Sequence, residues 1–157
     1  MNKKDWMLWA VIVVIDQLAK IYIASVMKLG QSIEVIDGFF YITFVRNTGA
    51  AWSLFSALSM RWVFVIMAIA VCVVIYRYLM RNSCRPLTKA SLVMIMGGSI
   101  GNMLDRAVTG SVVDFLHFFI FGYDFPVFNI ADCFLSVGTA LLVVAIMVEK
   151  EPKKKDE

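Results

Sequence analysis

Two aspartates, Asp114 and Asp132, bracket an apolar and aromatic stretch of the chain and stand 18 residues apart. Two carboxyl groups brought together in a site of low dielectric cannot both ionise, so they share one proton. The ionised group can then act as general base to a water molecule, and the protonated group as general acid to a scissile carbonyl. The pair therefore predicts aspartic-peptidase chemistry, with Asp114 and Asp132 as the catalytic residues.

Asn129 and Asp132 also have a simpler structural explanation. Asn129 can cap a helix that begins at Ile130, with Asp132 as its third residue, in a variant of the capping box. Both explanations stay open for this pair, whereas Asp114 lies on an apolar strand or loop and has no such explanation. Because the positive end of that helix would favour a carboxylate, we expect Asp132 to be the ionised partner and Asp114 to carry the shared proton more often.

Other polar residues interrupt apolar segments. Asp16 and Lys20 are four residues apart and share a helix face, and a lone charge at the centre of a membrane helix costs roughly 2.5–3.5 kcal/mol. The pair should therefore face other helices, either as support for the site or as a structural pair in which Lys20 extends toward the membrane surface. Asn102 and Asp105 also share a face, and Asp105 at a helix C-terminus needs a partner, either Arg106 or a backbone donor.

Rival chemistries fit the sequence less well. The chain has one histidine, His117, and no zinc-peptidase H-E-x-x-H motif, so we expect no metal site. Cys133 lacks a partnered histidine that would make its thiol a nucleophile. Asp124, which comes just before Pro126, is interpreted as a turn residue. No cofactor is predicted.

A glycine-rich segment, Gly97 to Gly101, matches the G-x-S-x-G pattern of serine hydrolases. That pattern requires a strand, a turn and a helix in succession, but here it falls inside an apolar helix. We interpret Gly97 and Gly101 as a small-xxx-small pair that lets two helices approach closely.

The composition indicates a membrane protein. Of 157 residues, 61% are hydrophobic and 17% charged, and the formal net charge is only +3, which excludes a disordered chain and a nucleic-acid-binding arm. We expect a single membrane domain over 1–157 that is mainly α-helical. Its four transmembrane helices are predicted at about 6–27, 60–80, 87–104 and 130–148, followed by a charged cytoplasmic tail at 149–157.

The distribution of lysine and arginine predicts the orientation. Ten of them fall on the side shared by the two termini and the middle loop, and four on the other side, which puts both termini in the cytoplasm. Asp114 and Asp132 would then lie at the extracytoplasmic surface. There we also expect a small β-sheet over about 31–46, with a hairpin at Asp37-Gly38, and a short interfacial helix over 49–55.

Five sequence blocks, taken in order, resemble the motifs of the bacterial lipoprotein signal peptidases (signal peptidase II). They are Asp16–Lys20, Arg46–Trp52, Gly101–Arg106, Val112–Phe115 and Phe128–Asp132. The resemblance covers about residues 9 to 148. The departures are small and remove no carboxylate or asparagine: they are Ala19, Trp52 and Cys133.

The resemblance implies an aspartic endopeptidase of the bacterial cytoplasmic membrane that needs no cofactor or metal. It would cleave a prolipoprotein just before its diacylglyceryl-modified cysteine and be inhibited by the cyclic peptide globomycin. We also expect a monomer that contacts membrane lipids and binds no nucleic acid. Besides the two aspartates, the resemblance implies substrate-binding roles for Asn47, Asn102, Arg106 and Asn129, and supporting roles for Asp16, Lys20, Gly49 and Asp105.

Without the resemblance, the residues are also compatible with two other classes of protein. Buried acids in small helical bundles also mark transporters and proton relays, although here the acids gather at one surface. A scaffold could use the same polar groups for helix packing. Replacement of Asp114 by Asn distinguishes the three classes, because a scaffold tolerates it, a relay loses proton coupling and a peptidase loses cleavage.

Overall fold

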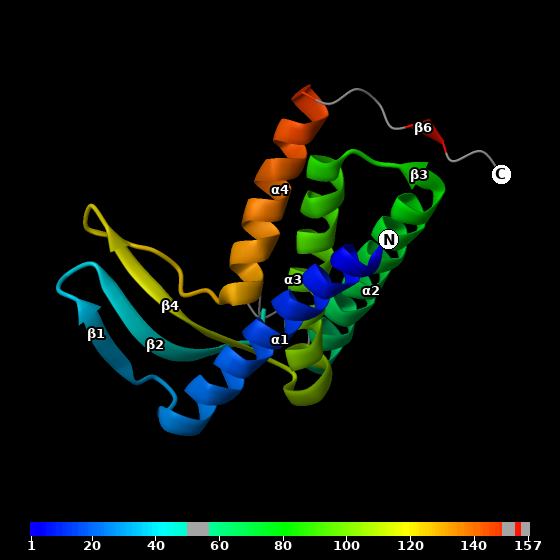
Figure 1. Cartoon of the computed structure of the whole chain (residues 1–157). Coiled ribbons are helices and arrows are strands. Elements are labelled where there is room, and N and C mark those ends of the chain that lie inside the picture. The colour runs from blue at the N-terminus through cyan, green and yellow to red at the C-terminus, as the bar shows by residue number, and fades with distance from the viewer. Residues whose placement is uncertain (50–56, 149–152, 155–157) are drawn as a thin grey trace.

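The computed structural model describes residues 1–49, 57–148 and 153–154, and it is mainly helical with a small antiparallel sheet at one end (Figure 1). The helices are α1 (Lys3–Val26), α2 (Ala57–Arg81), α3 (Pro86–Thr109) and α4 (Ile130–Val148). The strands are β1 (Ser32–Ile36), β2 (Phe40–Asn47), β3 (Asn82–Ser83), β4 (Val112–Ile120), β5 (Tyr123–Asp124) and β6 (Lys153–Lys154). The interfacial helix predicted over 49–55 lies almost wholly outside the described residues.

Among the described residues, three helical segments are long and apolar enough to cross a membrane: Lys3–Val26, Arg61–Arg81 and Ile130–Val148. Helix α3 lies among the other three helices and packs against each of them. It carries buried polar residues such as Ser91, Asn102 and Asp105. These polar residues make α3 less apolar than its neighbours. They are tolerated because they are buried inside the protein.

The sheet has four strands in the order β1-β2-β4-β5. The hairpin predicted at Asp37-Gly38 is confirmed, since β1 and β2 pair antiparallel on either side of that turn. Strand β2 then pairs antiparallel with β4, which brings Val45 opposite Asp114. The sheet therefore extends beyond the predicted 31–46 segment and incorporates the chain that carries Asp114.

The glycines of α3 allow close helix contacts, as the small-xxx-small pattern predicts. A Cβ atom added at Gly97 would lie 2.9 Å from Ile12 of α1, and one at Gly101 would lie 2.6 Å from Asp16 Oδ2. Ile12 and Asp16 are one turn apart on α1, so the two glycines accommodate one face of that helix. This face carries Asp16 into the bundle.

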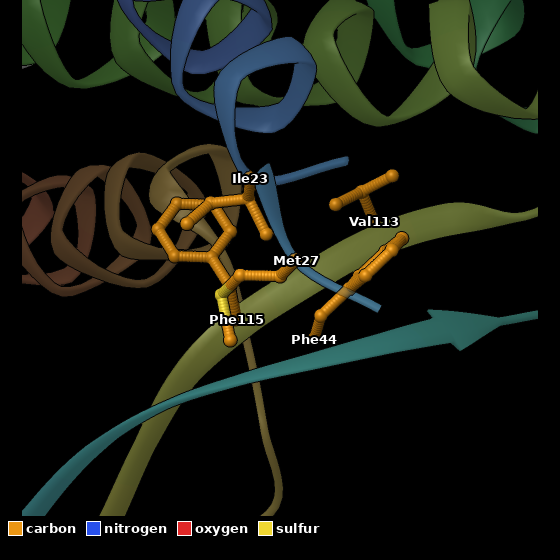
Figure 2. Close-up of a cluster of buried hydrophobic side chains, with 5 residues drawn as sticks. All are labelled: Ile23, Met27, Phe44, Val113 and Phe115. Carbon is orange, nitrogen blue, oxygen red and sulfur yellow. The ribbon is translucent and has the colours of Figure 1, made fainter. Parts of the chain in front are cut away.

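A buried apolar cluster joins the end of α1 to the sheet. Figure 2 shows Ile23 of α1 and Met27, which follows that helix, packed with Phe44 of β2 and with Val113 and Phe115 of β4. Side chains alternate along a strand, so the residue between Val113 and Phe115 points away from this cluster. That residue is Asp114, and the cluster fixes the face on which its carboxyl group lies.

Candidate active site

Asp114 is the central acid of a buried polar site. Its side chain is only 2% exposed, and two asparagine amides donate to its two oxygens. Asn129 Nδ2 lies 2.5 Å from Oδ1, and Asn47 Nδ2 lies 3.1 Å from Oδ2. The carboxyl group is thus withdrawn from solvent and held by donors from two different segments.

Asn129 connects this acid to Asp132. The backbone N–H of Asp132 donates to Asn129 Oδ1 over 3.0 Å, and the backbone N–H of Asn129 donates to Asp132 Oδ2 over 3.2 Å. The predicted capping box is therefore confirmed. The side-chain amide of Asn129 donates to Asp114 as well, so one side chain both caps α4 and contacts the other acid.

Asn102 of α3 completes the connection between the acids. Its Nδ2 donates to Asp132 Oδ1 over 2.7 Å, and its Oδ1 accepts from Asn129 Nδ2 over 3.0 Å. Lys20 Nζ donates to the same Oδ1 over 2.9 Å. Two asparagine side chains therefore bring Asp114 and Asp132 into one hydrogen-bond network, and the buried Lys20 joins this network through its bond to Asn102.

Lys20 is the cation of a buried ion cluster. Its Nζ lies 2.8 Å from Asp16 Oδ2 and 3.3 Å from Asp105 Oδ2, and the lysine is 2% exposed. The alternative in which Lys20 extends to the membrane surface is therefore wrong. Two carboxylates and one asparagine bind the Lys20 ammonium, and these interactions offset the free-energy cost of removing its charge from water.

The two acids of this cluster also bind backbone donors on other elements. Asp16 Oδ1 accepts from the N–H of Ala131 at the start of α4, over 2.8 Å. Asp105 Oδ2 accepts from the N–H of Val113 on β4, over 3.0 Å. The expectation that a backbone donor would partner Asp105 is confirmed. The cluster consequently fixes the residue next to each of the two site aspartates.

Gln17 belongs to this cluster, although the sequence analysis assigned it no role. Its Nε2 lies 3.2 Å from Asp16 Oδ2, 3.1 Å from the Gly101 carbonyl and 3.0 Å from Asp105 Oδ1. Only the position of Gln17 beside Asp16 could have pointed to it. Adjacent residues lie on different helix faces, so helical spacing alone gave no reason to group the two.

Gly49 orients the amide of Asn47. Its backbone N–H donates to Asn47 Oδ1 over 2.9 Å, which leaves Nδ2 to face Asp114. Gly49 has a φ of +73°, and an added Cβ would lie 2.5 Å from the ring of Phe64. Both the backbone conformation and the close approach therefore require glycine here.

Arg106 lies near the two aspartates, and it forms no ion pair with either among the described residues. Its guanidinium sits 4.7 Å from the centroid of the Phe64 ring, a cation–π contact. Its charge interacts with those of Asp132 and Asp114, and its buried Nε has no hydrogen-bond partner among the described residues. The positive charge of Arg106 is therefore placed next to the two aspartates.

Three residues considered for other chemistry lie elsewhere. His117 contacts Thr43 Oγ1 through Nδ1 (3.0 Å) and Asp124 Oδ1 through Nε2 (2.6 Å), so it belongs to the sheet. Asp124 lies in β5, which corrects its assignment to a turn: the turn is at 121–122. The Cys133 thiol donates to the Asn129 carbonyl over 3.4 Å. The described residues contain no group of three or more metal-binding side chains.

The environment makes Asp114 a weaker acid than usual. Burial raises its pKa to about 6, and the charge of Asp132 acts in the same direction. The amides of Asn47 and Asn129 and the charge of Lys20 oppose this rise by stabilising the carboxylate. Asp114 therefore retains its proton at a pH where an ordinary aspartate is ionised.

Comparison with known proteins shows the family. A family model described as "Signal peptidase (SPase) II" matches residues 8–148. This chain belongs to the signal peptidase II family. The family consists of membrane proteases that remove signal peptides from prolipoproteins. The relation inferred from the five sequence blocks is therefore confirmed.

Individual relatives support the signal peptidase II assignment over nearly the whole chain. The lipoprotein signal peptidase of Bacillus subtilis (strain 168) is 42% identical over 153 residues, which cover 97% of this chain and 98% of the relative. That of Staphylococcus aureus (strain MRSA252) is 41% identical over 146 residues, covering 93% and 89%.

Two solved structures of a bacterial membrane enzyme, determined by the in meso method, share the fold. The structure at 2.3 Å resolution has a TM-score of 0.83, 36% sequence identity, and coverage of 96% of this chain and 94% of that one. The structure at 1.9 Å resolution has a TM-score of 0.86, 36% identity, and coverage of 94% of each chain.

The buried ion cluster generates a prediction on stability. Lys20→Met leaves Asp16 and Asp105 buried without their cation, which should lower the free energy of unfolding by about 3–5 kcal/mol. Unfolding by sodium dodecyl sulfate in mixed micelles measures the change. Lys89→Met is the matched control, since Lys89 lies 3.8 Å from Asp5 in a partly exposed pair and should cost at most about 1 kcal/mol. Equal losses in the two variants would contradict the role of Lys20.

The two functions of Asn129 can be separated. A serine at this position still caps α4 but cannot reach Asp114, whereas an alanine does neither. Asn129→Ser should therefore be about 1 kcal/mol more stable than Asn129→Ala in the same unfolding assay. Both variants should lose most of the cleavage activity proposed below. Full activity in the serine variant would show that the contact with Asp114 is dispensable.

Proposed function

We propose that this protein is an aspartic endopeptidase that cleaves diacylglyceryl-modified prolipoproteins immediately before the lipidated cysteine. The observation that supports this most is the network in which Asn129 and Asn102 link Asp114 to Asp132. Such a network holds two acids in different environments close to each other, as hydrolysis by a shared proton requires. Membership of the signal peptidase II family supplies the substrate class.

The proposed mechanism divides the work between the two acids. Asp132, at the positive end of α4, is the ionised base that takes a proton from water as the water oxygen attacks the scissile carbonyl. Asp114 gives its proton to the carbonyl oxygen. When the tetrahedral intermediate collapses, the proton held by Asp132 goes to the departing amine of the cysteine, and Asp114 recovers its own from the new carboxyl group.

Asn47 and Arg106 are the proposed substrate-binding groups nearest the entrance. Asn47 is exposed at the end of β2 and donates to Asp114, while the charge of Arg106 interacts with those of both aspartates. Each can hydrogen-bond a backbone carbonyl of an extended substrate. Asn102 and Asn129 hold the acids, and Asp16, Lys20, Gly49 and Asp105 keep these groups in position.

The proposed topology has four transmembrane helices, with α3 as the fourth, in a bacterial cytoplasmic membrane. Both termini are cytoplasmic by the positive-inside rule, so the start of α4 and its Asp132 lie at the extracytoplasmic surface. A substrate that carries a membrane helix and a lipid reaches that surface from within the bilayer. No cofactor is needed, and the enzyme is proposed to act as a monomer inhibited by globomycin-type cyclic peptides.

The direct test is cleavage of a purified diacylglyceryl-prolipoprotein in micelles, followed by its shift in size. Asp114→Asn and Asp132→Asn should each abolish cleavage while the protein stays folded, because either change leaves the pair without a base or an acid. Asp37→Asn, in the exposed hairpin turn, is the control and should cleave like the parent. Cleavage at the parental rate by both site variants would show that Asp114 and Asp132 are not the catalytic pair. If the parent does not cleave and the two variants lose a proton transport that the parent has, the transporter alternative would replace this proposal.

The raised pKa of Asp114 predicts the pH dependence of cleavage. Because the acid is protonated below pH 6, kcat/KM should fall about tenfold per pH unit once the pH rises above the pKa. Asn47→Leu removes a donor that lowers this pKa, so the fall should begin at higher pH. Rates across a pH series in both proteins provide the measurement. A fall that begins at the same or a lower pH in the variant would be inconsistent with Asp114 as the acid.

A further inference from the structure

The turn between β4 and β5 carries an unusual residue. Phe121 and Gly122 both have positive φ angles, 51° and 80°, and Phe121 is the one residue other than glycine with a positive φ among those described. Glycine, asparagine or aspartate normally occupies such a hairpin turn. The Phe121 ring is also fully exposed. Neither the backbone conformation nor packing within this chain explains a phenylalanine here.

Other exposed apolar side chains surround this turn. Ile120, Tyr123 and Phe125 come from the same hairpin, and Phe39 comes from the neighbouring β1–β2 hairpin. Phe39 is held there because the N–H of Phe119 donates to its carbonyl over 2.8 Å. We call these residues, together with Phe121, the aromatic tip. Between positions 118 and 128 the sequence has a single charged residue, Asp124. Its carboxylate is hydrogen-bonded to the His117 ring.

The aromatic tip lies where lipid is expected. In Figure 1 the hairpins extend sideways, away from the helices, and their free ends are level with α4 rather than beyond its N-terminal end. Helix α4 is apolar enough to cross a membrane and starts at the membrane surface in the proposed topology. A side chain at the level of α4 therefore lies within the thickness of the bilayer and not in the water beyond its surface.

We propose that the aromatic tip inserts into the outer leaflet of the phospholipid bilayer that the helices cross. This inference rests on the proposed topology. Aromatic side chains are favoured at the membrane–water interface, and apolar residues of interfacial segments enter it by about 5–10 Å. Lipid thus compensates for exposure of the Phe121 ring. Asp124 and the backbone of the turn stay among the polar headgroups.

This anchor bears on the active site through β4. The strand runs from Val112 to Ile120 and carries Asp114 near one end and the aromatic tip at the other. Contact of the tip with lipid fixes the height and tilt of β4 relative to the membrane. The sheet is thereby held over the site at the level where a substrate embedded in the same leaflet presents its cleavage point.

The test places a fluorescent probe at the tip. Phe121→Trp is reconstituted in nanodiscs of phosphatidylcholine brominated near the headgroup end of its acyl chains, and the emission of the parent is subtracted. Most of the added emission should be quenched by the brominated lipid and little by aqueous iodide. Lys28→Trp is the control, because Lys28 is exposed on the connection from α1 to β1, and it should show the reverse.

Quenching of Phe121→Trp by iodide alone would overturn the proposal, as would a blue shift that appears only when a second copy or the lipidated substrate is added. A second variant gives an independent readout. Phe121→Asn suits the positive φ, so its Tm in micelles should equal or exceed that of the parent. Its kcat/KM should fall several-fold in nanodiscs and stay unchanged in micelles, and equal values in both environments would count against an anchor. Since quenching does not depend on cleavage, it remains informative if the proposed peptidase activity fails.

Discussion

The ion pairs that Lys20 makes with Asp16 and Asp105 hold the functional part of this molecule together. Three charges withdrawn from solvent are tolerable only if each has its partners, which makes this arrangement intolerant of displacement. The partners lie on α1 and α3, and the same two aspartates bind the backbone at Ala131 and Val113. One cluster therefore joins two helices to the start of α4 and to β4.

The consequence for the site is geometric. Ala131 precedes Asp132, and Val113 precedes Asp114, so each backbone contact of the ion cluster immediately adjoins one of the two proposed catalytic residues. The asparagines then set the side chains: Asn129 caps α4 and donates to Asp114, and Asn102 donates to Asp132. Charged groups fix the backbone and neutral amides orient the carboxyl groups, which is the arrangement that the proposed proton exchange between the two acids requires.

The sheet and the helices make different contributions. The apolar cluster between α1 and β4 determines which face of the strand carries Asp114. The glycines at 97 and 101 let α1 approach α3 closely enough for Asp16 to enter the bundle. The proposed lipid contact of the aromatic tip adds an external restraint on the same strand. The sheet and the helices therefore act together to position the two proposed catalytic acids.

The sequence by itself determined the contacts between residues that are close together in the chain. Helical spacing put Asp16 beside Lys20, the Asn129-x-x-Asp132 pattern predicted the capping box, and Asp37-Gly38 predicted the first hairpin, because these interactions involve residues close in the chain. Only the tertiary structure decided that Lys20 turns inward, that Gln17 joins its cluster and that β4 pairs with β2. These outcomes depend on partners more than 60 residues away, such as Asn102 and Asp105, whose approach is set by helix packing that no local pattern encodes.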